Sequence, residues 1–223
     1  MPPSNPTPWH TLSAEETLAQ LQSSARGLSA DEAQQRLAQV GRNELVDQGG
    51  VSPWKILWGQ LTSIMVVVLI IAGAIAAFLG DLEDTIVILA LVVINTAIGF
   101  YQEYNAEKAM AALKQMAVPT VRVRRDGVVR EMAAPELAPG DIVLLEAGNR
   151  VPADGRLING AGLQVQEAAL TGESAPVAKT IAPLANADVA LGDRRNMVYM
   201  GTNVTTGRGE YAVTATGMQT ELG

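Results

Sequence analysis

Two uncharged apolar segments, separated by only five residues, constrain the fold of this chain more than any other feature. Residues 61–79 and 85–101 contain no Asp, Glu, Lys or Arg, whereas residues 80–84 between them carry three acids. At 1.5 Å per residue, helices of these lengths would span roughly 25–28 Å, close to the hydrocarbon thickness of a bilayer. The pattern predicts a transmembrane helical hairpin. The alternative is a pair of buried core helices in a water-soluble protein.

The charges around the hairpin predict its orientation. Lys and Arg residues occur before residue 61 and after residue 101, and the connecting residues 80–84 contain none. Because basic residues are enriched in cytoplasmic segments, both flanks are expected in the cytoplasm and the acidic connection outside. We therefore expect an integral membrane protein with the N-terminus and the region after the hairpin in the cytoplasm. A bacterial plasma membrane is its expected location.

The rest of the chain divides into parts of different character. Residues 1–50 are expected to form a small helical region, because two Ser-x-x-Glu capping boxes begin at Ser13 and Ser29. Residues 51–104 contain the hairpin. Residues 105–117 extend its second helix as a stalk rich in Ala, Glu, Lys and Met, which favour helix.

Residues 118–223 change to short strand-like runs bounded by Gly, Pro or Asn. Asp126-Gly127 between two such runs is a strong signal for a two-residue hairpin. About a hundred residues of this pattern predict an all-β domain with a distorted barrel or jelly-roll-like fold, on which the N-terminal helices pack. The strands are expected at residues 120–125, 128–132, 142–146, 156–158, 163–167, 196–200 and 210–216.

Composition excludes several functional classes. Hydrophobic residues make up 48% of the chain, which excludes intrinsic disorder, and the formal net charge of -7 argues against a nucleic-acid partner. The absence of Cys excludes thiolate zinc sites and cysteine nucleophiles. No P-loop occurs. The single histidine, His10, is expected to be solvated in a loose leader, which argues against a Ser–His–Asp site.

The clearest candidate for chemistry is the segment Thr171-Gly172-Glu173-Ser174. Gly172 permits a tight turn and Pro176 stiffens its exit, so that Glu173 is expected at an exposed loop tip. A carboxylate presented in this way can orient and deprotonate a water molecule for attack on another domain. On these four residues alone, however, a solvated Glu in an ordinary turn is the better interpretation.

The motifs around this loop give Glu173 more weight. They follow one another along the chain as Gly27-Leu28-Ser29, residues 41–45 (GRNEL), residues 95–113, Pro139-Gly140-Asp141, residues 151–154 (VPAD), residues 170–174 (LTGES), Gly201-Thr202-Asn203 and residues 214–223. From about residue 9 onward, this order resembles the N-terminal third or quarter of a P-type cation-transporting ATPase. The resemblance is to the type II group, which includes calcium and sodium/potassium pumps, and residues 118–223 resemble its actuator domain.

The resemblance implies a mechanism and a set of partners. In that family ATP, with Mg²⁺, phosphorylates an aspartate in a separate domain, and the actuator loop then reaches the acyl phosphate. Glu173 is implied to orient the attacking water, and Thr171 and Gly172 to set the loop and shield the phosphate, with Ser174 completing the motif. The implied partners are the lipid bilayer, the other domains of the pump and a transported cation. Ca²⁺ is the leading cation, and Na⁺ or another monovalent cation is the alternative.

Departures from the family pattern limit what this chain is expected to do alone. Gln166 and Ala168 stand where family members often carry Asp and Ser. No Asp-Lys-Thr-Gly phosphorylation motif occurs in the 223 residues, so we expect an N-terminal fragment that by itself binds no ATP or metal and hydrolyses no ATP. The alternatives are a membrane-tethered β domain that acts as a binding or scaffold module, and an independent hydrolase using Glu173. The hydrolase is disfavoured because no second acid, base or metal cluster accompanies Glu173.

Overall fold

The computed structural model describes residues 7–45, 52–116 and 119–223, which belong to two compact units. The β unit joins the N-terminal residues 7–45 to residues 119–223, and the helical unit consists of residues 52–116. The boundaries predicted at residues 50/51 and 117/118 lie outside the described residues. The two units are treated separately below.

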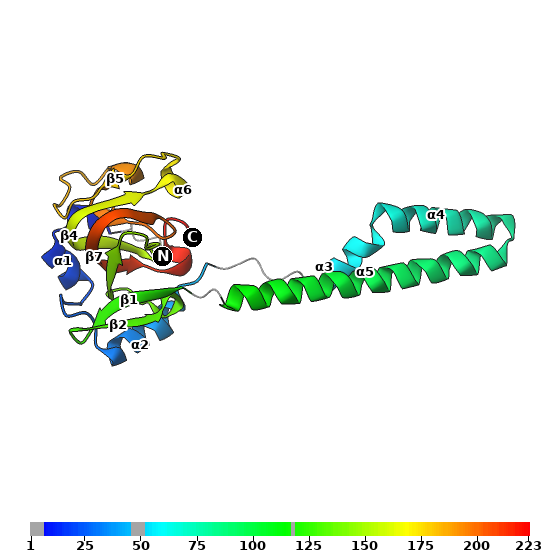
Figure 1. The fold of residues 1–223 in the computed structure, drawn as a ribbon, viewed down its shortest axis with the longest axis horizontal. Coiled ribbons are helices and arrows are strands. Elements are labelled where there is room, and N and C mark those ends of the chain that lie inside the picture. Colours follow the sequence, from blue (N-terminus) through cyan, green and yellow to red (C-terminus); the bar gives the residue numbers. More distant parts are fainter. Residues whose placement is uncertain (1–6, 46–51, 117–118) are drawn as a thin grey trace, which may run out of the picture. The chain divides into compact units, whose positions relative to one another are not determined.

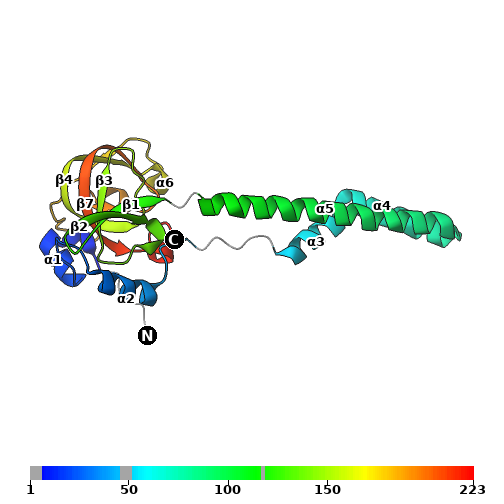
Figure 2. The ribbon, with the colours of Figure 1, turned by 60° about the horizontal axis from the view of Figure 1, so that its bottom comes forward.

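The helical unit contains three helices, α3 (Pro53–Leu61), α4 (Ile64–Leu79) and α5 (Leu82–Met116). Helix α4 runs alongside α5 in both views (Figures 1 and 2). Gly80 ends α4 in the left-handed conformation, with φ of 83°. Glu83 and Asp84 already lie in the first turn of α5, where the helix dipole favours acidic side chains. The connection is therefore shorter than the five residues predicted.

The first predicted span, residues 61–79, is interrupted near its start. α3 ends at Leu61, α4 begins at Ile64, and the two helix axes differ by 55°. Thr62 Oγ1 donates a hydrogen bond to the carbonyl of Trp58 at 2.9 Å, and Ser63 is the N-cap residue of α4. A hydroxyl that bonds to the carbonyl four residues earlier, as Thr62 does, often bends a helix.

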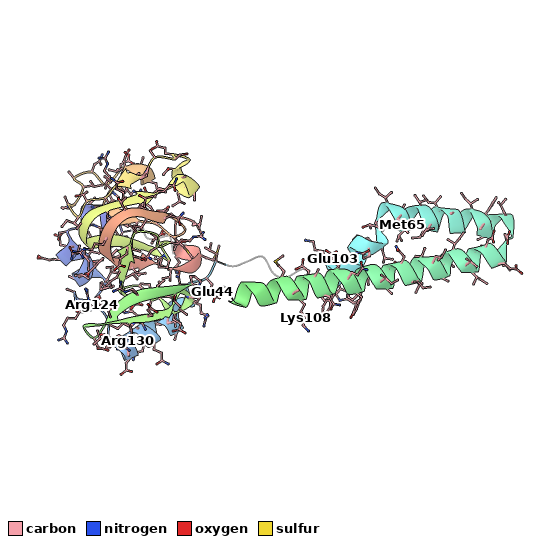
Figure 3. The ribbon with its side chains drawn as sticks, in the orientation of Figure 1. Glu44, Met65, Glu103, Lys108, Arg124 and Arg130 are labelled. Carbon is pink, nitrogen blue, oxygen red and sulfur yellow. The ribbon has the colours of Figure 1, made fainter. Side chains whose placement is uncertain are left out.

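The helical unit leaves most of its large apolar side chains exposed. Residues Leu82–Met110 of α5 are long and apolar enough to cross a membrane, and the bent pair α3–α4 qualifies as a second, broken span. Ile71 on α4 is 55% exposed and Val93 on α5 is 67% exposed. Met65, also on α4, is exposed, whereas Glu103 and Lys108 carry charges on the later turns of α5 (Figure 3).

The β unit contains a seven-stranded antiparallel sheet in the order β2-β1-β3-β7-β4-β5, with β6 paired to β4. Asp126 and Gly127, both at positive φ, form the predicted turn between β1 and β2. The strands are β1 (Thr120–Arg125), β2 (Val128–Ala133), β3 (Ile142–Glu146), β4 (Asp154–Gln166), β5 (Val177–Ala178), β6 (Met197–Val198) and β7 (Asn203–Ala215).

The prediction of an all-β domain is confirmed, but the distorted barrel or jelly-roll-like form expected for it is corrected, because the sheet is not closed into a barrel. Its order has two ends, β2 and β5, and β5 is only two residues long. The strands predicted at residues 156–158 and 163–167 are one strand, β4 (Figure 1). β4 and β7 continue past a register shift between Ala161 and Gln164, beside Gly162 at φ of 60°. In the sequence, glycine suggested that a strand ends here. In the structure, the strand continues through an irregularity that accommodates the glycine.

Two short helices from the N-terminal residues pack on this sheet, as predicted. These helices are α1 (Ala14–Gln20) and α2 (Ala30–Val40), and both predicted capping boxes form, at Ser13 and at Ser29. α1 packs against β4, and Figures 1 and 2 show α2 beside the β1–β2 hairpin. There the N–H of Asp126 donates to the carbonyl of Leu28 at 3.0 Å.

His10 is buried rather than solvated, which corrects the sequence prediction. This residue belongs to a short 3-10 helix, η1 (Trp9–Thr11), and is only 3% exposed. Nε2 lies 3.0 Å from the carbonyl of Ala187, and the carbonyl of His10 accepts the side-chain amide of Asn196. Burial, assisted by Arg194, lowers the pKa of His10. Contacts with residues more than 170 positions away hold it, and no local pattern encodes them.

Candidate functional site

The candidate loop connects β4 to β5. After β4 the chain forms a four-residue helix, α6 (Ala168–Thr171), and Gly172 ends it in the left-handed conformation with φ of 76°. Such a backbone favours glycine, and no other atom would approach a Cβ at this position within 4 Å. Gly172, Glu173 and Ser174 are exposed, whereas Thr171 is half-buried. The helix end therefore presents Glu173 at the surface.

Hydrogen bonds within the loop fix its backbone. Thr171 Oγ1 donates to the carbonyl of Glu167 at 3.2 Å and accepts the N–H of Glu173 at 3.3 Å. Gln166 Nε2 donates to the carbonyl of Ser174 at 3.2 Å, so that this residue, which departs from the family pattern, closes the loop across its width. In the part of the chain that the structure describes, no side chain pairs with the carboxylate of Glu173. That carboxylate is free to meet a group from elsewhere.

A buried ion pair lies at the base of the loop, and the sequence analysis missed it. Lys179 Nζ lies 2.5 Å from Glu167 Oε1, and both side chains are essentially inaccessible. Burial raises the pKa of Glu167 and lowers that of Lys179, while the attraction between the two opposes both shifts. A possible signal was an acid and a base placed immediately outside the two ends of a loop, but the sequence does not show that they point inward.

Two other family-like motifs meet each other in the β unit. The N–H of Gly201 donates to the carbonyl of Val151, and the N–H of Val151 donates to the carbonyl of Thr202, both at 2.9 Å. Asp154, which ends the VPAD segment, accepts the backbone N–H groups of Met200 and Glu221, each at 2.7 Å. Burial outweighs these two bonds and raises the pKa of Asp154 to about 6. This carboxylate holds backbone rather than facing the surface.

The motif at Pro139-Gly140-Asp141 is also structural. Asp141 is fully buried and receives two bonds from Arg125, of 2.8 and 2.6 Å. Arg156 is also buried, without an acidic partner among the described residues, which the sequence did not predict. Its guanidinium donates to the carbonyls of Leu12 and Ile181, and burial lowers its pKa to about 10. These groups tie the N-terminal segment and the loops to the sheet.

Among the described residues, no metal cluster includes the candidate loop, and a cavity in the β unit is lined by other residues. Within residues 7–45, 52–116 and 119–223, no group of three or more His, Cys, Asp or Glu side chains could hold a metal ion. A cavity of about 590 Å³ in the β unit is lined by residues that include Trp9, His10, Asp154, Arg194 and Tyr199. The chemistry available at the loop is therefore that of one exposed carboxylate on a fixed backbone.

Comparisons with known proteins agree with this organisation. The family described as P-type ATPase actuator domain matches residues 115–223, and the family described as cation transporter/ATPase, N-terminus, matches residues 9–76. Calcium-transporting ATPase 1 of Bacillus cereus is 43% identical over 220 residues, which cover 96% of this chain and 25% of that protein. The calcium-transporting ATPase of Bacillus subtilis is 41% identical over 198 residues, or 89% of this chain and 22% of that protein.

A fungal relative carries a different name. The sodium/potassium exporting P-type ATPase cta3 of Schizosaccharomyces pombe is 43% identical over 205 residues, which cover 91% of this chain and 20% of that protein. The chain thus spans about a quarter of the length of the curated relatives it matches. Two family models match in consecutive order, and identities above 40% extend over most of the chain. The chain therefore belongs to the P-type cation-transporting ATPases and carries their N-terminal region and actuator domain.

Proposed function

We propose that this chain is the N-terminal and actuator part of an ATP-driven cation pump, in which Glu173 promotes hydrolysis of the aspartyl-phosphate intermediate. The observation that carries the proposal is the presentation of Glu173. Its carboxylate is exposed and unpaired among the described residues, directly after left-handed Gly172, on a loop whose backbone is held by Thr171 and Gln166.

The chemistry required of Glu173 is modest. An acyl phosphate is already activated, so the step needs a water molecule in line with the bond that breaks and a group that takes its proton. As the water oxygen bonds to phosphorus, the bond from phosphorus to the aspartate oxygen breaks, and the proton passes to the Glu173 carboxylate. Thr171 and Gly172 set the approach of the loop and shield the phosphate, and Ser174 completes its exposed surface.

ATP supplies the phosphoryl group in the complete pump, with Mg²⁺ as its cofactor, and no residue of this chain is assigned to either. The transported cation is proposed from relatives: Ca²⁺ is favoured by the names of the two Bacillus proteins. A monovalent cation is the alternative, supported by the name of the Schizosaccharomyces pombe protein. The exposed apolar surfaces of α4 and α5 support the lipid bilayer as a partner.

Glu173→Gln in the full-length pump tests the catalytic role. The amide cannot accept the proton of the attacking water, so the phosphoenzyme should form normally from ATP but decay about 10²–10⁴-fold more slowly. The measurement is phosphoenzyme decay after a chase with unlabelled ATP, under conditions that reach the dephosphorylating conformation. Glu131→Gln, an exposed carboxylate on β2, is the matched control and should decay at the wild-type rate.

The result distinguishes catalysis from an ordinary surface turn. If Glu173 were merely solvated, its replacement by Gln would leave turnover near normal and stability within about 0.5 kcal/mol. A folded Glu173→Gln variant that forms phosphoenzyme and loses it at the wild-type rate would remove Glu173 from the mechanism.

The proposed localisation places both the N-terminus and the β unit in the cytoplasm. All 16 Lys and Arg residues lie outside residues 61–101, which supports this orientation. Since the chain has no native Cys, single cysteines at Asp81 and Arg130 report the two sides of the membrane. An impermeant thiol reagent added to intact cells should label the cysteine at 81 and spare that at 130. The reverse pattern would overturn the orientation.

A further inference from the structure

Glu167 and Lys179 close the base of the loop that carries Glu173. Glu167 follows the end of β4 and Lys179 follows the end of β5, so the ion pair joins the two strand ends between which the loop is suspended. The N–H of Lys179 donates to the carbonyl of Leu163 at 2.9 Å, and its ammonium lies 5.9 Å from the centre of the Tyr199 ring. Both charged groups are therefore held from several directions.

The pair is also linked to Glu173 through the backbone. The carbonyl of Glu167 accepts the N–H groups of Leu170 and Thr171, at 2.9 and 3.0 Å, and the hydroxyl of Thr171. That hydroxyl accepts the N–H of Glu173. A continuous series of contacts thus leads from the buried ammonium to the residue at the loop tip. A shift of Glu167 must be transmitted to the backbone from which the Glu173 carboxylate projects.

Stability alone does not account for this ion pair. Burying two charges costs more than their attraction returns unless the remaining polar atoms are also satisfied, and apolar replacements of similar size are often as stable. Glu167 Oε2 is buried and has no hydrogen-bond partner among the described residues. A pair with an unsatisfied oxygen is a poor stabilising device. It does, however, hold the residues that follow β4 and β5 together, because Oε1 and Nζ are in contact there.

We infer that Glu167 and Lys179 are positioning residues for Glu173, and that their ion pair fixes the direction in which the loop presents its carboxylate to the aspartyl phosphate. The inference rests on the proposed function of Glu173 and adds two residues that touch neither water nor phosphate. Directional control matters because in-line attack is sensitive to geometry, and a misplacement of about 1 Å can cost on the order of 10²-fold in rate.

The test uses the double variant Glu167→Gln/Lys179→Gln in the full-length pump. Either single substitution leaves one buried charge unpaired and is strongly destabilising, whereas the double variant removes both charges together. The matched control is Arg125→Gln/Asp141→Asn, which neutralises another buried pair of the same sheet. Phosphoenzyme decay after a chase is measured only on molecules that have been phosphorylated, so that a lower yield of folded pump does not alter the rate constant.

We expect the Glu167/Lys179 double variant to form phosphoenzyme from ATP and to lose it about 10–100-fold more slowly. The Arg125/Asp141 control should decay at the wild-type rate. In a Glu173→Gln background the Glu167/Lys179 substitutions should cause no further slowing, because residues that act through Glu173 have nothing left to position.

Each other outcome identifies which idea fails. Wild-type decay in the Glu167/Lys179 variant, with slow decay in Glu173→Gln, overturns the inference and leaves the proposed function intact. If the Glu167/Lys179 substitutions slow decay as much in the Glu173→Gln background as in the wild type, the inference is also overturned, because the pair would then act independently of Glu173. If phosphoenzyme decay is slowed equally in the Arg125/Asp141 control, the inference is overturned, because the effect would then reflect a general loss of structure. Wild-type decay in Glu173→Gln itself contradicts the proposed function.

Discussion

The β unit and the helical unit of this chain place their apolar side chains differently. In the β unit Val123, Leu157 and Tyr211 belong to one buried cluster enclosed by the sheet. In the helical unit Ile71, Ile75 and other large side chains of α4 and α5 are more than half exposed. Water stabilises the first arrangement and opposes the second, because exposed apolar area is unfavourable in water. The comparison teaches that the two units are folded for different solvents.

The two units also differ in how polar side chains bond to the backbone. The β unit uses side chains to satisfy its backbone: Ser13 and Ser29 cap their helices, and Asp154 accepts two backbone N–H groups. Ser52 and Ser63, at the N-caps of α3 and α4, make no side-chain cap bond. Side-chain caps therefore begin α1 and α2 in the β unit, whereas α3 and α4 begin without them.

The largest expected contrast comes from placing a charge on an exposed isoleucine of each unit. Ile71→Arg introduces a charge into α4 and should disfavour insertion of the hairpin by about 3 kcal/mol. Ile181→Arg, at a loop position of the β unit that is 47% exposed, should change stability by no more than about 0.5 kcal/mol. The fraction of chain that resists alkaline extraction from membranes measures the difference. Equal retention of both variants would show that α4 does not lie in lipid.

A smaller effect is expected from the titration of Asp154, whose pKa is raised from 3.8 to about 6 by burial. Between these values the folded chain binds more protons than the unfolded chain. The stabilisation that results is complete below pH 3.8 and is lost as the pH rises through about 6. It amounts to at most about 3 kcal/mol, so Asp154→Asn should remove this part of the pH dependence.

The measurement is denaturant unfolding of the chain in detergent at several pH values. Trp9 lies in the β unit, and replacing Trp54 and Trp58 of the helical unit by Phe makes its fluorescence specific for the β unit. The free energy of unfolding of the wild type should exceed that of Asp154→Asn at pH 4, and this difference should decrease as the pH rises to 6. Parallel profiles for the two chains would show that Asp154 does not titrate in this window.

The smallest contrast concerns the helix caps. Ser29→Ala removes a cap that accepts the N–H of Glu32 at 3.2 Å and should cost about 1 kcal/mol of stability in the β unit, seen by the same fluorescence. Ser63→Ala removes no such bond and should change the stability of the helical unit by less than about 0.5 kcal/mol. Thermal unfolding followed by helical circular dichroism measures this change. Comparable losses at both positions would contradict the different use of caps in the two units.

Local features of the fold followed from the sequence because neighbouring residues determine them. Charge-free length predicted the hairpin helices, the Ser-x-x-Glu spacing predicted both capping boxes, and Asp126-Gly127 predicted the β1–β2 turn. Gly172 predicted an exposed turn in the same way, since a left-handed residue is a property of that position alone. For the candidate site, the sequence located the loop and the exposed carboxylate.

Tertiary structure decided what depends on residues far apart in the chain. Whether the sheet closes depends on pairing between its end strands, and the burial of His10 depends on residues beyond position 180. The Glu167–Lys179 pair forms because β4 and β5 bring both side chains to one interior point. The sequence by itself thus determined which helices are long and apolar enough to cross a membrane and where Glu173 is displayed. Only the folded sheet decided which charges are buried beneath it, because burial is set by contacts that local sequence does not encode.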